Sequence, residues 1–124
     1  MPRIYYSQRP EDLMRQYNSV VIRWDIQEEP TQTTEGGQQP QWSAYQAVVF
    51  APISQNKVVE TVLTKTFPSN DEQKLINEYN AAQLGLYNDG EMEQKIQRYK
   101  RFLQDRAALK SEIERICNEN GITE

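Results

Sequence analysis

Apolar residues in the C-terminal half of the chain recur at steps of three and four. Between Glu91 and Asn118 the chain contains neither Gly nor Pro. The pattern is typical of a helix with one apolar stripe and polar faces elsewhere. Its apolar positions are Met92, Ile96, Tyr99, Phe102 with Leu103, Leu109, Ile113, and Ile116 with Cys117. We predict one amphipathic helix of about seven turns, which Asn120-Gly121 ends.

A shorter helix is predicted directly before the long one, over Asn70–Leu84. The Phe67-Pro68 pair ends the preceding element, and Ser69 followed by Glu72 has the spacing of a capping box. Its apolar stripe consists of Leu75, Ile76, Tyr79, Ala82 and Leu84 or Leu86, and it runs to Gly85. Residues 86–90 have turn composition, and a short connection favours antiparallel neighbours. Residues 69–120 should therefore form a helical hairpin.

The long helix also has near-heptad spacing through Ile96, Tyr99 and Leu103. Arg106 and Lys110 occupy the next seam positions, which weakens a long parallel coiled coil. Packing against the shorter helix, with some surface left for a partner, is the favoured interpretation.

Strict alternation replaces the helical repeat between Asn18 and Glu28. Apolar positions alternate with outward ones, which is typical of a half-buried strand: Val20, Ile22, Trp24 and Ile26 against Val21, Arg23, Asp25 and Gln27. Trp42–Ala51 is predicted as a second strand. The two pair most economically as an antiparallel hairpin. The segment 29–41 between them has no apolar residue, two Pro and a Gly pair, and is expected to be an exposed, mobile loop.

Three further segments complete the predicted elements. Ile4-Tyr5-Tyr6 is β-prone and suits an edge strand or an arm. Pro10-Glu11-Asp12 has the chemistry of a helix start, so we expect two helical turns over Pro10–Tyr17. For residues 55–67 the apolar spacing favours a helix that Ser54 caps, whereas the β-branched content favours a third strand; helix is preferred.

The predicted fold class is α+β, with an antiparallel β-hairpin packed on helices and a C-terminal helical hairpin. We expect a single domain over residues 1–124, with an α+β part at 1–68 and the helical hairpin at 69–120. Hydrophobic residues make up 37% of the chain. A small core of this kind suits an elongated protein or one that completes its core with a partner.

The residue types exclude several chemistries. The chain has no His, which removes Ser-His and Cys-His dyads and histidine metal sites. Cys117 is the single Cys and lies on the apolar stripe, so we interpret it as buried packing. No phosphate-binding loop or dinucleotide motif is present. We predict no enzymatic activity, no catalytic residue, no cofactor and no metal.

Six side chains are candidates for partner binding. Trp24 and Trp42 lie on the two predicted strands, where filling the core is the favoured role and a binding face the alternative. On the long helix the candidates are Arg98, Tyr99, Arg101 and Phe102. Its basic residues, interleaved with aromatics, also permit contact with nucleic acid. A net charge of −4 makes nucleic acid the less favoured partner.

The C-terminal half resembles a known group of proteins. The Phe67-Pro68 break is followed by the acidic helix 69–84 and then by a helix with Tyr99, Phe102-Leu103, Arg106 and Lys110. Over residues 67–117 this order resembles small accessory proteins of phage and prophage tail modules, of the tail-fibre assembly type. The resemblance implies a non-enzymatic assembly or structural role and assigns no binding residues.

We therefore expect an interaction or assembly protein that binds a protein partner or itself, with a homo-oligomer favoured. The alternative is a nucleic-acid-associated regulator that uses the basic face of helix 91–118. No apolar run reaches the roughly 20 residues of a membrane span, and the first ten residues lack a signal-peptide core. A cytoplasmic protein without membrane contact is expected.

Overall fold

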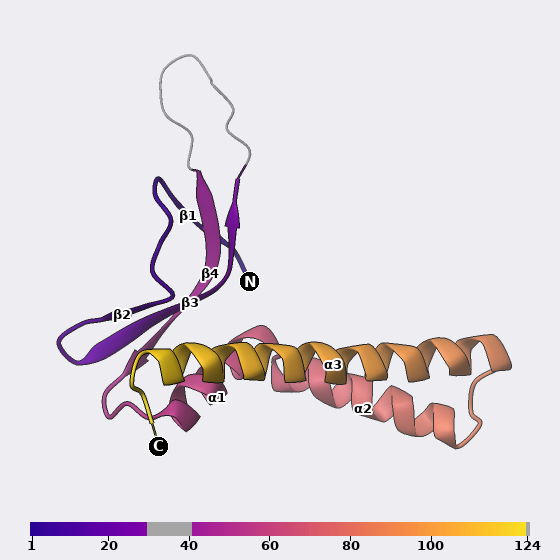
Figure 1. Ribbon diagram of the computed structural model, residues 1–124. Helices are drawn as coiled ribbons and strands as arrows, with labels where there is room; N and C mark the ends of the chain where they lie inside the picture. The colour runs from indigo at the N-terminus through magenta and orange to yellow at the C-terminus, as the bar shows by residue number, and fades with distance from the viewer. Residues whose placement is uncertain (30–40, 124) are drawn as a thin grey trace, which may run out of the picture. The chain divides into compact units, whose positions relative to one another are not determined.

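The computed structural model describes residues 1–29 and 41–123. Four strands form one antiparallel sheet, and three helices follow them in the chain (Figure 1). The strands are β1 (Ile4–Tyr6), β2 (Leu13–Arg15), β3 (Ser19–Glu28) and β4 (Trp42–Phe50), and the helices are α1 (Gln55–Thr66), α2 (Ser69–Gln83) and α3 (Asp89–Glu119). The predicted α+β class is confirmed.

The chain divides into two compact units. The first runs from Met1 to Val62 and takes in the last turns of α3 from Glu112 onward. The second is Leu63–Ser111. Both α1 and α3 therefore belong partly to each unit.

The sheet of the first unit has the strand order β1-β4-β3-β2. Its centre is the predicted antiparallel hairpin of β3 and β4, in which Val20 lies opposite Val49 and Trp24 opposite Tyr45. The short strand β1 pairs with the start of β4, so the predicted edge strand at residues 4–6 is confirmed. Residues 30–40, which fall within the predicted hairpin loop, lie outside the described residues.

Residues 10–17 are not helical, and the prediction of two helical turns there is wrong. The chain forms β2 instead, with Leu13 opposite Ile22 and Arg15 opposite Val20. A two-turn helix is marginal in water by itself. The edge of β3, by contrast, supplies backbone partners and a buried position for Leu13. Sheet pairing therefore outweighs the local helix-start chemistry.

The sheet has an inner and an outer face. Alternate residues of β3 and β4 put one set of apolar side chains on the inner face, where Val20, Ile22, Trp24, Ala47 and Val49 are all buried. The buried side chains of the helical segments in this unit complete the core: Val58, Val59, Val62, Ile113, Ile116 and Cys117. The predicted inward alternation of β3 is confirmed at Val20, Ile22 and Trp24.

Helix α1 confirms the helical interpretation of residues 55–67 over the strand. The backbone N–H of Lys57 donates to the Ser54 hydroxyl at 3.1 Å, as expected for an N-cap. The valines at positions 58, 59 and 62 are buried. Burial on the inner face of the sheet outweighs the β preference of these branched side chains.

The second unit contains the predicted helical hairpin. Helix α2 and the first part of α3 run in opposite directions, with Tyr79 and Tyr99 ring centroids 4.6 Å apart. The predicted capping box is wrong: Pro68 occupies the N-cap position, and no side chain caps the helix. Ser69 is then already the first helical residue, because the Pro68 carbonyl accepts the N–H groups of Asp71 and Glu72.

Both helices that end in a predicted glycine stop do so with the same hydrogen-bond pattern. Gly85 and Gly121 have φ values of 73° and 72°, a region that glycine adopts without strain. Beyond them, the Leu86 N–H donates to the Ala81 carbonyl and the Ile122 N–H to the Cys117 carbonyl. This is the Schellman motif.

Candidate functional site

The outer face of the sheet carries an apolar patch made by neighbouring strands. Met14 on β2 lies opposite Val21 on β3, and Val21 lies opposite Val48 on β4. Phe50 follows on the same face of β4. Val21 is buried, whereas Met14, Val48 and Phe50 are 36%, 40% and 62% exposed. We call Met14, Val21, Val48 and Phe50 the outer patch.

Beside the outer patch the chain crosses the same face of the sheet. Residues 7–12 connect β1 at one edge with β2 at the other. A cleft of about 500 Å³ lies there. Its lining comes from the crossing segment, from β1 and from two sheet residues: Tyr5, Tyr6, Ser7, Gln8, Arg9, Pro10, Glu11, Met14 and Arg23.

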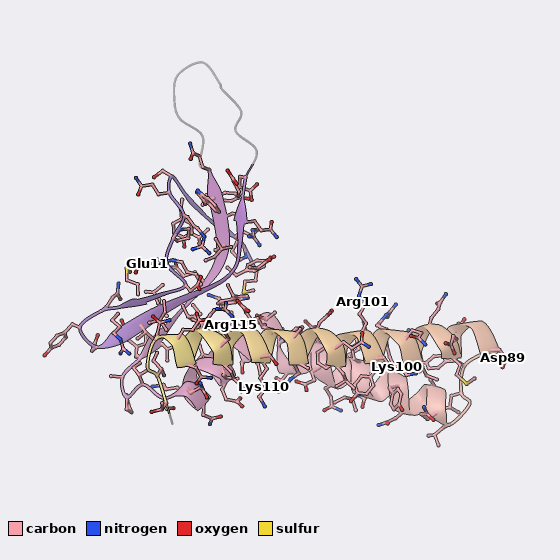
Figure 2. All side chains as sticks on the ribbon, viewed as in Figure 1. Glu11, Asp89, Lys100, Arg101, Lys110 and Arg115 are labelled. Carbon is pink, nitrogen blue, oxygen red and sulfur yellow. The ribbon has the colours of Figure 1, made fainter. Side chains whose placement is uncertain are left out.

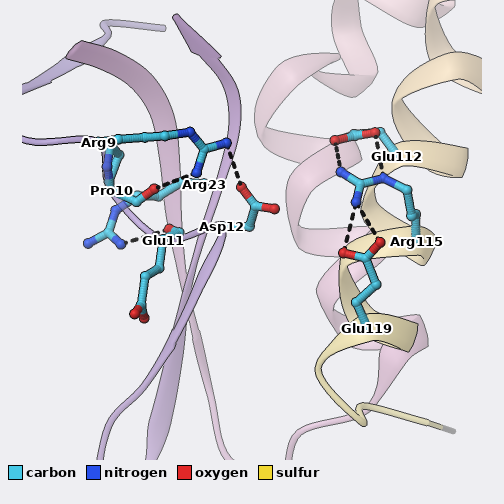
Figure 3. Close-up of polar contacts among 8 residues, drawn as sticks. All are labelled: Arg9, Pro10, Glu11, Asp12, Arg23, Glu112, Arg115 and Glu119. Atoms are coloured by element: carbon cyan, nitrogen blue, oxygen red, sulfur yellow. Dashed lines mark hydrogen bonds and ion pairs between the residues drawn. The ribbon is translucent and has the colours of Figure 1, made fainter.

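Arg23 anchors the crossing segment. Its Nε donates to the Tyr6 hydroxyl and to Gln46 Oε1, both at 3.1 Å. Its Nη1 donates to the Glu11 carbonyl at 3.0 Å, the contact drawn in Figure 3. The Tyr6 hydroxyl in turn donates to Gln46 Oε1. Arg23 is only 9% exposed. The sequence pattern placed it on the outward side of a half-buried strand, and that side is covered here by the crossing segment.

A second arginine holds the N-terminus against the sheet. Arg3 Nη1 pairs with the Asp25 carboxylate at 2.9 Å, and its Nε donates to the Ser43 hydroxyl at 2.9 Å. Its guanidinium lies 4.6 Å from the centre of the Tyr45 ring. Burial acts to lower the pKa of Arg3, but attraction to the Tyr45 and Asp25 side chains raises it overall, so the group stays charged.

The two tryptophans have different environments. Trp24 is 3% exposed and lies 6.1 Å from the Tyr45 ring, measured between ring centroids. Trp42 is half-buried at the start of β4, with the Arg9 guanidinium 6.0 Å from its ring. Trp24 thus has the core environment that the sequence favoured, and Trp42 keeps part of its surface accessible.

The aromatic candidates on α3 pack against aromatic rings that precede it in the chain, Tyr79 of α2 and Phe67 between α1 and α2. Phe102 is buried and meets the Phe67 ring edge-on, with centroids 5.4 Å apart. Tyr99 is half-buried against Tyr79. Leu103, which the sequence grouped with Phe102 on the apolar stripe, is 46% exposed. Successive helical residues are about 100° apart, so only one of this pair can face Phe67.

The basic residues of α3 do not converge on one face. Lys95 and Arg98 both pair with Glu78 of α2, at 3.5 and 3.4 Å. Arg101 and Lys110 are nine positions apart, which places them about 180° apart around the helix, and Figure 2 shows them on opposite sides. The predicted partner residue Arg101 is exposed. No single basic strip suited to a phosphate backbone results.

Near the C-terminal end of α3, Arg115 forms ion pairs with two glutamates of the same helix. Arg115 donates to Glu112 at 2.5 Å and to Glu119 at 2.8 Å, three residues before and four after it (Figure 3). Hydrogen bonds to Glu112 and then to Glu119 raise the pKa of Arg115. The side chain thus stabilises the last turns of the helix.

Cys117 is fully buried in the first unit. Burial raises the pKa of its thiol, and the negative charge of Glu114 adds to the effect. A raised pKa keeps the sulfur protonated and unreactive near neutral pH. The sequence-based interpretation of this residue as buried packing is confirmed.

No group of three or more His, Cys, Asp and Glu side chains in residues 1–29 and 41–123 is arranged to hold a metal ion. None of the described helices combines the length and apolar character needed to cross a membrane.

Comparison with known proteins adds no relative. The chain matches no protein-family model, no curated protein and no solved structure.

The sequence pattern did not lead to a prediction of either the outer patch or the cleft over Arg23. Each depends on β2 and on the crossing segment, in the stretch that was predicted as a helix. One signal was present: Val21, on the outward side of β3, is apolar where a solvated face would favour a polar residue.

Proposed function

We propose that this protein is a non-enzymatic interaction protein that associates with a second copy of itself through the outer patch. The observation that carries the proposal is the exposure of Met14, Val48 and Phe50 in neighbouring positions on one sheet face. Soluble proteins tend to cover contiguous apolar surface, and patches of this kind mark interaction sites.

The chemistry of the outer patch favours a second copy as the partner. None of its four residues is charged, so nothing in the patch selects a partner of opposite sign. An uncharged apolar patch can pack against its own image about a two-fold axis, the commonest symmetry of homo-oligomers. The small hydrophobic fraction of the chain, 37%, supports the same conclusion, because a dimer interface adds to the buried apolar area.

The test is the mass of the protein in solution, measured by light scattering during size-exclusion chromatography. We expect a dimer for the unaltered protein and a monomer for the double variant Val48→Asp with Phe50→Asp. Both side chains are exposed, so the variant should keep its circular dichroism spectrum. A strict monomer across the accessible concentration range would contradict the proposal.

The matched control is Leu84→Asp with Leu86→Asp. These leucines are 75% and 71% exposed and belong to the second unit. They are apolar and exposed like the outer patch, but they are remote from it in the sequence. The control variant should remain dimeric, and a monomeric control would move the interface away from the sheet.

The biological role that we propose is assembly. The resemblance of residues 67–117 to accessory proteins of phage tail modules supports a cytoplasmic assembly factor. Sequencing of the genes next to this one tests the idea directly. Neighbouring tail or capsid genes would support the role, and a neighbourhood of unrelated metabolic genes would oppose it.

A further inference from the structure

The cleft over Arg23 contains a buried cation whose hydrogen-bond partners among the described residues are all uncharged. Among the described residues, no ion pair includes Arg23, although its side chain is almost fully enclosed. Its hydrogen-bond acceptors are a hydroxyl, an amide oxygen and a backbone carbonyl, all of them neutral. A guanidinium removed from water in this way favours a negative charge nearby.

One end of the guanidinium remains available. The three acceptors occupy Nε and Nη1, and within residues 1–29 and 41–123 Nη2 makes no hydrogen bond. Arg23 lines the cleft. Its position is held by the Tyr6 ring, whose centre lies 5.2 Å from the guanidinium carbon. The cation is therefore oriented in advance, with N–H donors left over for a ligand.

We propose that this cleft binds a carboxylate group carried next to an apolar group. A planar carboxylate accepts two parallel hydrogen bonds from a guanidinium. The tyrosines at positions 5 and 6 and the Met14 side chain supply apolar wall for the neighbouring group. The cleft volume of about 500 Å³ accommodates a ligand larger than a single ion.

The other charges around the cleft favour a monoanion over a phosphate. Arg9 and Arg23 line the cleft together with one carboxylate, Glu11. Glu11 gives Arg23 only its backbone carbonyl. Asp12 lies 4.0 Å from Arg9 and partly neutralises it. A phosphate dianion would face both acidic side chains with little more than one free positive charge to hold it.

The carboxylate could come from a small acid or chain terminus, or from an acidic side chain of a partner protein. Both present the same chemistry to Arg23, so the experiment includes one probe for each source. This inference does not require that the outer patch mediates dimerisation. Ligand binding is measured by the NMR signal of the Arg23 side chain, and dimerisation by the mass of the protein in solution. Failure of one proposal can therefore be distinguished from failure of the other.

The experiment is a heteronuclear NMR titration of the full chain that follows the arginine Nε–H signals. The first probe is N-acetyl-leucine, with N-acetyl-leucinamide as the uncharged analogue. The second probe is a blocked Leu-Glu dipeptide amide, which carries only a side-chain carboxylate. We expect millimolar carboxylate to shift the Arg23 signal and the backbone amide signals of residues 9, 11 and 12, and the uncharged analogue to leave them unchanged.

The Arg23→Gln variant should lose affinity by about tenfold or more, because hydrogen bonds to charged groups are the stronger ones. The control, Arg101→Gln, alters an exposed arginine on α3 and should bind as the unaltered protein does. If Arg23→Gln fails to fold, the shift of the Arg23 signal in the unaltered protein decides the question.

Three results would overturn the proposal. The first is an Arg23 signal that stays fixed with both carboxylate probes. The second is equal binding of N-acetyl-leucinamide, which would make the cleft an apolar site only. The third is tighter binding of inorganic phosphate than of either carboxylate. A response to one carboxylate probe alone supports the proposal and identifies the source.

Discussion

At the scale of single residues, two arginines hold the N-terminal segment on the sheet by different means. Arg23 uses neutral acceptors, whereas Arg3 uses a carboxylate, Asp25, at the point where the register of β3 and β4 shifts. Asp25 has a φ of 53°, in the left-handed region that few side chains favour. Asp and Asn tolerate this conformation better than other residues with a side chain. The position thus combines a backbone requirement with a charge.

Two substitutions separate these roles of Asp25. Asp25→Ala should lower the free energy of unfolding by about 1–2 kcal/mol, because it loses the ion pair and strains the backbone. Asp25→Asn loses only the charge and should cost under about 1 kcal/mol. Urea denaturation followed by tryptophan fluorescence measures both. Equal costs for the two variants would show that the backbone conformation contributes nothing.

Cys117 should make the free energy of unfolding decrease at alkaline pH. Because burial raises its pKa in the folded state, the unfolded chain releases the thiol proton first. The stability is complete below the unfolded pKa of about 8.5 and falls as the pH rises above it. Urea denaturation at one pH below and one pH above this unfolded pKa should give a smaller free energy of unfolding at the higher pH. The Cys117→Ala variant should lack this decrease. The same dependence of the free energy of unfolding on pH in the variant and in the unaltered protein would show that Cys117 is not its cause.

At the scale of elements, each helix of the second unit has one neighbour within that unit. A two-helix hairpin buries a narrow stripe, so Phe102 is enclosed while Tyr99 is only half-buried. The sequence repeat located the apolar stripe of α3 but left Phe102 and Leu103 together on it. Adjacent residues on a helix point about 100° apart, so both cannot be buried by a narrow contact. Contact with Phe67, in the link between α1 and α2, distinguishes Phe102 from Leu103.

Substitution of these two neighbours tests the assignment. Phe102→Ala should destabilise the protein by about 3 kcal/mol, because it removes a buried ring and its edge-on contact with Phe67. Leu103→Ala should cost about 0.5 kcal/mol, as expected at an exposed position. Thermal denaturation followed by circular dichroism compares the two. A larger loss of stability in Leu103→Ala than in Phe102→Ala would show that Leu103, and not Phe102, is on the buried side of α3.

At the scale of the whole molecule, α3 is the element that both units share. Its residues up to Ser111 belong to the second unit, and those from Glu112 onward complete the core of the first. Both tryptophans are in the first unit, whereas circular dichroism reports the helices of both. The two signals can therefore be followed separately during unfolding.

An unbroken α3 should couple the two units, so the two signals should change together in the unaltered protein. Ser111→Pro removes a helical hydrogen bond where the units meet in the sequence and should cost about 3 kcal/mol. It should also separate the two transitions. Ser111→Ala keeps the helix intact and should leave them coincident. Separate transitions in the unaltered protein would contradict the coupling.

The sequence by itself determined the elements with a long repeat. The central hairpin, the helices α2 and α3 and the glycine stops at Gly85 and Gly121 all follow from periodicity and local backbone chemistry, which act over a few residues. For α1 the spacing and the β-branched content disagreed, and burial against the sheet decided for helix. The buried roles of Trp24 and Cys117 follow from the same patterns.

Only the tertiary structure decided what residues 10–15 do. Their local preference is for a helix start, but β3 offers an edge at which Leu13 becomes buried and the backbone is paired. That pairing carries the chain across the outer face of the sheet, encloses Arg23 and exposes Met14 beside Val48. Contacts between segments distant in sequence outweigh a short propensity, because burial and sheet hydrogen bonds involve more free energy than two turns of helix.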